Sequence, residues 1–140
     1  MQNLDQICAK YGFKFAEKIS KDDAKKAEKL ITDALSVLQE QGLYAFVLFC
    51  RSKSEAKELE NLTKELLEEL DLIKNLKVKE KENITMKDAR ESNDDLLDKI
   101  RENILADIDK LMFAVSVIEK SLIYARFHTK AIKESRGESS

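Results

Sequence analysis

Proline is absent from this chain and glycine occurs only three times in 140 residues. These two residues mark most turns and interrupt most helices, so their scarcity removes the usual signals of a protein built from many strands and tight turns. Charged residues make up 37% of the chain, and lysine and glutamate, both good helix formers, dominate among them. The composition therefore favours helices joined by short connections.

Cysteine and histidine are nearly as rare, because Cys8, Cys50 and His128 are the only examples. The two cysteines lack C-x-x-C spacing, and neither is spaced to join His128 in a zinc site or a nucleophile pair. We interpret both cysteines as reduced core residues in apolar surroundings, and His128 as a residue of a helix surface.

Motifs of known chemistry are missing as well. There is no glycine-rich phosphate loop, no serine elbow and no H-E-x-x-H sequence. Arg126 and His128 invite comparison with helical ribonucleases of the HEPN class, but that motif needs a longer gap than one residue. We therefore predict no catalytic residue and no cofactor.

Long apolar runs are absent too. The longest covers residues 43–50, against roughly 20 residues for a membrane span. The first residues lack the basic and then apolar pattern of a signal peptide. We expect a cytoplasmic protein without a membrane-bound segment.

The strongest positive signal is an apolar stripe with helical spacing in the last third of the chain. One unbroken helix over residues 94–134 would be about 60 Å long, too long for a compact domain of this size, so we expect a break near Asn103. The prediction is an all-α bundle of five to six helices with a long C-terminal helix, forming a single domain over residues 1–134 with a frayed tail over 135–140. The stripe consists of Leu97, Ile100, Ile104, Ile108, Leu111, Val115, Ile118, Leu122 and Ala125.

Two further helices are predicted before residue 42. The second follows Ser20–Asp23, which resembles a capping sequence, and ends at Gly42, where we expect a left-handed conformation. The apolar face of the first helix comprises Leu4, Ile7, Cys8, Tyr11, Phe15 and Ile19. That of the second comprises Ala27, Leu30, Ile31, Ala34, Leu35 and Leu38.

The apolar run 43–50 has no second strand to pair with, so we predict a central, fully buried helix there. An amphipathic helix capped by Ser54 follows, and the charged stretch 77–82 is predicted to be a solvated loop. Thr85 and Asp88 have the spacing of a cap for another helix. The apolar face of the helix after Ser54 comprises Leu59, Leu62, Leu66, Leu70 and Ile73.

Paired carboxylates open one enzymatic alternative. Glu65 and Glu68, with Glu69 beside them, and Asp95 and Asp98 each lie on one helix face. Two such helices chelate magnesium in all-α nucleotide pyrophosphatases. In a chain with 27 acidic residues such pairs usually line a hydrated face, so no metal site is predicted and the enzyme stays an alternative.

Basic residues are concentrated toward both ends. Residues 1–53 carry nine basic and seven acidic side chains, residues 54–110 eleven and seventeen, and residues 111–140 five and three. Terminal helices lying side by side would combine two basic stripes into one positive surface able to follow a phosphate backbone. With no aromatic platform among them, we expect non-specific contacts. The stripes are Lys10, Lys14 and Lys18, and Arg126, Lys130 and Lys133.

Three segments carry a family resemblance: the opening residues 1–7 with Ala9, the Gly42-Leu43 turn into an apolar helix, and residues 123–127 with Lys130-Ala131. Together they resemble the small helical subunit of the type III-B CRISPR Cmr effector complex. The resemblance spans most of the chain.

This resemblance implies a helical, non-catalytic subunit. Copies of it would line a ribonucleoprotein filament beside the RAMP backbone subunits and help to accommodate the guide RNA and its target. It implies that Lys14, Lys18, Arg126 and Lys130 face RNA phosphates. The small subunit of the type III-A complex, with nearly the same role, is the related alternative.

Overall fold

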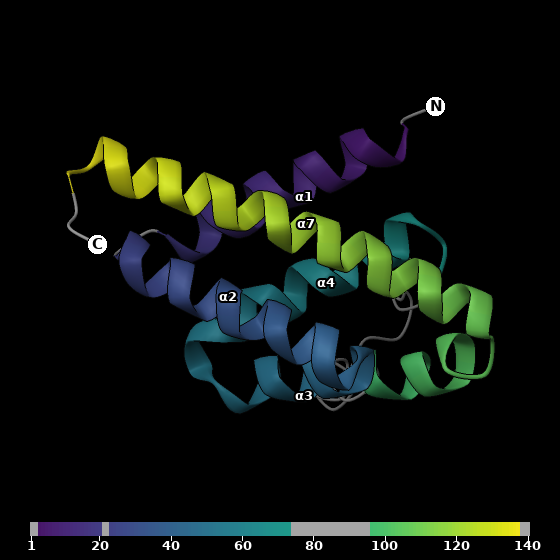
Figure 1. Ribbon diagram of the computed structural model, residues 1–140. Coiled ribbons are helices and arrows are strands. Elements are labelled where there is room, and N and C mark those ends of the chain that lie inside the picture. The colour runs from purple at the N-terminus through teal and green to yellow at the C-terminus, as the bar shows by residue number, and fades with distance from the viewer. Residues whose placement is uncertain (1–2, 21–22, 74–95, 138–140) are drawn as a thin grey trace, which may run out of the picture.

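The computed structural model describes residues 3–20, 23–73 and 96–137, and it is all-α within those ranges (Figure 1). The chain begins with α1 (Leu4–Ile19), α2 (Ala24–Gln41) and α3 (Leu43–Ser52). The short 3₁₀ helix η1 (Ser54–Ala56) then leads into α4 (Lys57–Glu69). After a helical stretch over 96–99, the π-helical turn η3 (Ile100–Ile104) precedes the long α7 (Ile108–Ser135).

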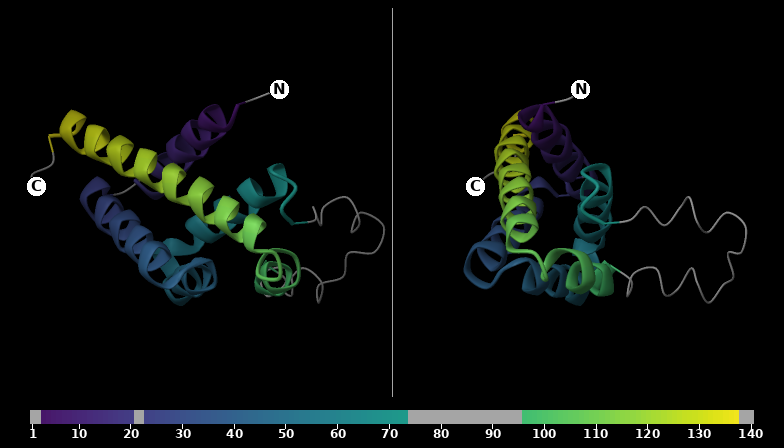
Figure 2. Two further views of the ribbon diagram at one scale, coloured as in Figure 1. Left: turned by 45° about the vertical axis from the view of Figure 1, so that its right-hand side comes forward. Right: turned by 90° about the vertical axis from the view of Figure 1, so that its right-hand side faces the viewer.

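Helix α7 organises the bundle, with α1 and α2 packed along it (Figure 1). The contacts from α1 advance in the same direction along α7, from Asp5 with Lys120 to the Ser20 carbonyl with Arg136, so these two helices are parallel. Helix α2 runs antiparallel to α7. Helix α4 packs against α1 and α3, and Figure 2 shows the helix that ends in η3 beside α3.

The start of each long helix has an identifiable cap. Asn3 and Gln6 form a capping box at α1, and Asp23 accepts hydrogen bonds from two backbone N–H groups at α2. Asp107 does the same at α7, accepting from the backbone of residues 109 and 110 at 3.0 and 3.2 Å. Ser54, by contrast, forms no side-chain cap for α4, so that detail of the prediction is wrong.

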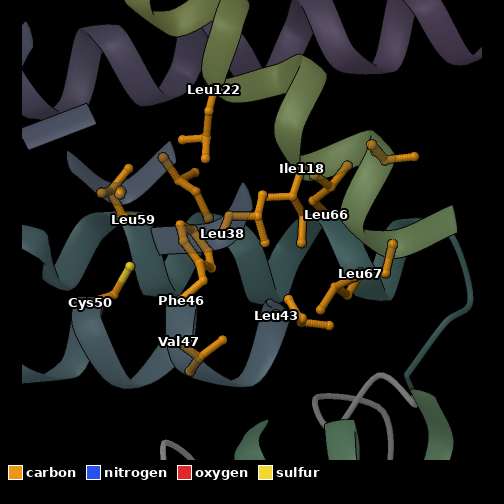
Figure 3. Close-up of a cluster of buried hydrophobic side chains, with 14 of the residues drawn as sticks. Leu38, Leu43, Phe46, Val47, Cys50, Leu59, Leu66, Leu67, Ile118 and Leu122 are labelled. Carbon is orange, nitrogen blue, oxygen red and sulfur yellow. The ribbon is translucent and has the colours of Figure 1, made fainter. Parts of the chain in front are cut away.

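The apolar faces of these helices meet in one continuous core (Figure 3). The face predicted for α2 is fully buried, and so is most of the face predicted for α1. The exceptions are at the two ends of α1, where Leu4 is 41% exposed and Ile19 is partly buried. The side chains labelled in Figure 3 come from four helices: Leu38, Leu43, Phe46, Val47, Cys50, Leu59, Leu66, Leu67, Ile118 and Leu122.

The expected break in the last helical segment is present. The backbone N–H of Leu105 donates a hydrogen bond to the Ile100 carbonyl at 2.8 Å, which spans five residues instead of the four of an α-helix. Asp107 then caps the start of a new helix. The prediction that Ile108 belongs to the core is wrong, since 70% of its surface is exposed, but the stripe residues Ile118, Leu122 and Ala125 are buried as predicted. The core face of α7 also includes Ala114, Val117, Ser121 and Thr129.

Two other predictions need correction. The helix over 43–50 exists, but it is not fully buried, because its outer face leaves Leu48 45% exposed. Gly42 has a φ of 95° with an extended ψ of −177°, which is a glycine conformation other than the left-handed helical one. Helix α7 ends at Ser135, and the next residue, Arg136, donates a hydrogen bond to the Ser20 carbonyl at 2.7 Å. The predicted loop 77–82 and the cap at Thr85 lie outside the described residues.

Candidate nucleic-acid interface

The basic stripe on α1 faces the acidic end of α4. Lys10 Nζ lies 2.9 Å from Glu69 Oε2, and Lys14 Nζ lies 3.6 Å from Glu65 Oε1. Tyr11 Oη donates a hydrogen bond to Glu69 Oε1 at 2.8 Å. Two of the three lysines predicted on α1 to contact RNA therefore already have carboxylate partners, and their positive charge is largely compensated.

The contacts with Lys10 and Tyr11 change the pKa of the Glu69 carboxyl group. Partial burial alone would raise the pKa of Glu69, but hydrogen bonds from Lys10 and Tyr11 outweigh it, so the pKa lies below its ordinary value of 4.5. The same site raises the pKa of the Tyr11 hydroxyl, through burial first and the Glu69 carboxylate second. This network joins α1 to α4 and leaves Lys18 as the exposed cation of the stripe.

The basic stripe on α7 has a different neighbour, the first turns of α2. Lys133 Nζ lies 2.8 Å from Glu28 Oε1, and only 14% and 17% of these two side chains are exposed. The pKa of Glu28 is lowered chiefly by that hydrogen bond, and the charges of Lys130 and Arg126 lower it further. Of these three cations of α7, Lys133 is the one that contacts the Glu28 carboxylate directly.

Arg126 and Lys130 are both exposed, four residues apart on one side of α7. Within residues 3–20, 23–73 and 96–137, neither side chain forms an ion pair or a side-chain hydrogen bond at close range. These two cations, with Lys18 on α1, are the predicted RNA-binding residues that the fold leaves accessible. The two stripes face different helices, α4 and α2, so the fold separates Lys10 and Lys14 from the cations of α7.

Aromatic side chains lie next to the basic stripe of α7, which the sequence analysis did not anticipate. Phe127, between Arg126 and Lys130 in the sequence, is 66% exposed. On α1, Phe13 is 52% exposed, and its ring meets that of His128 edge to face with centroids 5.6 Å apart. His128 is therefore a half-buried residue of the α1–α7 contact rather than an isolated surface group. In the sequence, Phe127 falls outside the apolar stripe that includes Ile118, Leu122 and Ala125, and this was the available signal that its ring is exposed.

A second exposed apolar group occupies the beginning of α7. Leu105, Ile108 and Met112 are 41%, 70% and 66% exposed, and Phe113 beside them is 37% exposed. We call these four residues the α7 apolar patch. Isolated exposed apolar residues are ordinary, but four within nine positions form a surface of the kind that contacts another protein.

Three of the five carboxylates considered for magnesium pair with cations, whereas Glu68 Oε2 is buried without a hydrogen-bond partner among the described residues. Glu65 and Glu69 are bound by lysines of α1, Asp98 pairs with Arg101 on the next turn, and Asp95 lies outside the described residues. Among the residues that the structure describes, no group of three or more histidine, cysteine, aspartate or glutamate side chains is arranged to hold a metal ion. No observation here favours the pyrophosphatase alternative.

Both cysteines are buried and free, as predicted. Cys8 Sγ contacts the Val117 carbonyl at 3.7 Å, and burial raises the pKa of both thiols, that of Cys50 to about 12. In the described part of the chain, no helix combines the length and apolar character that crossing a membrane requires.

Comparisons of the chain with protein-family models, with curated proteins and with solved structures return no match.

Proposed function

We propose that this chain is a non-catalytic structural subunit of a type III-B CRISPR effector complex. In this role it stacks along the filament on copies of itself and on RAMP backbone subunits, and it supports the binding of target RNA by the guide. The resemblance of its two ends and of its Gly42 turn suggests the family. The observation that carries the proposal is that Arg126 and Lys130 are exposed on the side of α7 whose third basic residue, Lys133, is paired with Glu28.

The chemistry of that cluster suits a phosphate backbone. Lys133 is held by Glu28, while Arg126 and Lys130 project from the exposed face of α7. Two cations one helical turn apart contact neighbouring phosphates, and each contact adds affinity that depends on salt and not on sequence. Repeated along a filament, such weak contacts add up because each bound copy raises the effective concentration of the next.

The α7 apolar patch supports the assembly part of the proposal. It lies at the end of α7 opposite to the cluster of cations, so a protein neighbour there leaves Arg126 and Lys130 free for RNA. Its acidic neighbours Asp107 and Asp109 make that end unfavourable for a phosphate backbone. Protein and RNA contacts are thereby assigned to different ends of one helix.

Reconstitution tests the proposal. The double variant Arg126→Glu with Lys130→Glu, assembled with backbone subunits and guide RNA, is expected to bind target RNA at least tenfold more weakly than the unmodified complex, with a larger deficit at low salt. The matched control is Lys53→Glu with Lys57→Glu, which makes the same change of charge at two exposed lysines, also four residues apart, away from α7. Equal binding by the test variant and the unmodified complex refutes the assigned RNA surface.

A tagged pull-down from the native organism tests the assembly. We expect RAMP backbone subunits and repeat-derived guide RNA among the bound molecules, and the identity of the backbone subunits distinguishes type III-B from type III-A. Recovery of a clean monomer with neither component contradicts the proposal.

A further inference from the structure

Two phenylalanines on neighbouring helices leave their rings in solvent beside the cations of α7. Phe13 on α1 and Phe127 on α7 are 52% and 66% exposed. The ring of His128, which follows Phe127 directly, stands edge-on to that of Phe13 with an interplanar angle of 80°. The rings of Phe13 and His128 are thus in contact between the parallel helices α1 and α7, and the exposed Phe127 directly precedes His128 on α7. We call these three residues the aromatic seam.

The seam is held in a fixed position by what lies beneath and beside it. Helices α1 and α7 approach so closely at Gly12 that its backbone lies against Ser121, Tyr124 and Ala125. Outside the seam, Asp5 accepts from both Lys120 and Tyr124, at 2.7 and 2.6 Å. Rings on two rigidly packed helices present a preformed surface, so a ligand does not have to order it on binding.

The charge beside the seam points to one class of occupant. Phe127 lies one helical turn from Lys130 on α7, and Glu28, whose pKa the charges of Lys130 and Arg126 help to lower, is already bound by Lys133. Exposed aromatic rings flanked by cations are the arrangement that binds single-stranded nucleic acids, because bases stack on the rings while the cations hold the phosphates. In duplex RNA the bases are paired and stacked inside the helix, so they cannot stack on such exposed rings.

We infer that the aromatic seam of Phe13, Phe127 and His128 is a base-stacking platform for single-stranded RNA whose phosphates are held by Arg126 and Lys130. This inference rests on the proposed RNA-binding function and extends it, since it makes the contact depend on unpaired bases as well as on charge. The preferred ligand is a strand with splayed bases rather than a continuous guide–target duplex.

The test compares two labelled probes of equal length and charge, a twelve-nucleotide oligouridylate and the same backbone without bases. The full-length protein is expected to bind the oligouridylate about tenfold more tightly than the abasic strand. Phe13→Leu with Phe127→Leu keeps both sites apolar but removes the rings, and it is expected to lose that preference while binding the abasic strand unchanged. Phe113→Leu, in the α7 apolar patch, is the matched control and keeps the preference.

The charge variant separates this inference from the proposed function. Arg126→Glu with Lys130→Glu is expected to weaken both probes. Suppose that the charge variant weakens both probes while the double leucine variant binds both as the unmodified protein does. That result refutes the base-stacking platform and leaves the proposed RNA-binding surface intact. If neither variant changes the binding of either probe, both are wrong.

Ring resonances provide a readout for weak binding. In NMR spectra of the isolated protein, about 1 mM oligouridylate is expected to move the Phe13 and Phe127 ring signals upfield as bases stack on them. Unchanged ring signals at that concentration overturn the inference. Shifts that depend on protein concentration without RNA assign the seam to a second copy of the chain and overturn it as well.

Discussion

A Cβ atom placed on Gly12 would lie 2.5 Å from the Cβ of Tyr124. No real pair of side chains tolerates that separation, so α1 and α7 pack at a distance that only glycine permits at this position. Both atoms belong to helix backbones or are attached directly to them, and neither can rotate away.

Replacing Gly12 with alanine is therefore expected to destabilise the fold by about 1–3 kcal/mol. Alanine in a helix normally gains roughly 0.5–1 kcal/mol over glycine, so the sign of the effect is diagnostic. Urea titration followed by circular dichroism measures it, with Ala9→Gly on the exposed side of the same helix as the control for propensity alone. A more stable Gly12→Ala variant would mean that the helices are further apart than described.

The ion pair between Arg51 and Glu60 connects α3 to α4. Arg51 Nη2 lies 2.8 Å from Glu60 Oε2, and only 7% of the Glu60 side chain is exposed. Glu60→Ala is expected to cost about 2 kcal/mol of unfolding free energy, because it leaves a partly buried guanidinium without this carboxylate. Glu58→Ala, at an exposed position of the same helix, should change stability by less than about 0.5 kcal/mol. If chemical denaturation shows that the two substitutions change the unfolding free energy equally, the Arg51–Glu60 ion pair does not contribute to stability.

Acid should weaken the contact between α2 and α7. The pKa of Glu28 in the folded protein is below the ordinary value of 4.5, so its contribution is complete above that value and is lost as the pH falls through the folded pKa. The stability difference between the unmodified protein and Glu28→Gln is expected to be about 1 kcal/mol near pH 7 and to shrink below pH 4.5. Thermal unfolding between pH 3 and 7 measures it, with Glu40→Gln, exposed on the same helix, as the reference. If the stability difference between the unmodified protein and Glu28→Gln stays constant with pH, the ionised Glu28 carboxylate does not stabilise this contact.

Neither cysteine should react while the protein is folded. Burial raises the pKa of Cys50 to about 12, which leaves roughly one thiolate in ten thousand at pH 8. Labelling with Ellman's reagent is expected to be slow in buffer and to reach two thiols per chain in denaturant. A cysteine introduced at the exposed Ser116 provides the rate for an accessible thiol. Rapid labelling of the native protein would mean that the core opens easily around Cys8 or Cys50.

Helix formation was predictable because it depends on local information. The buried positions of α2 follow a period of 3.6 residues, and the scarcity of glycine and proline leaves no competing turn signal. The break before α7 was also predictable from length, and its location near Asn103 is confirmed, but the residue at which the next helix restarts was not predictable. The wide hydrogen bond from Leu105 to Ile100 and the Asp107 cap decide where the helix restarts, and they put Ile108 on the outside.

The candidate site was predictable only as a set of cations. Sequence spacing placed Lys10 and Lys14 on one stripe and Arg126, Lys130 and Lys133 on another, since each spacing lies within one helix. Whether a cation has an anionic partner depends on residues far along the chain, 59 positions away for Lys10 with Glu69 and 105 for Lys133 with Glu28.

The amino-acid sequence by itself thus determined the secondary structure, the location of most core positions and the reduced, buried state expected of the cysteines, because these follow from short-range periodicity and composition. Tertiary structure alone decided which charges remain uncompensated, how closely α1 approaches α7 at Gly12, and that Phe13 and Phe127 stay exposed beside Arg126. Each of those outcomes depends on how separate helices are placed relative to one another, and the residue pattern within one helix does not determine that placement.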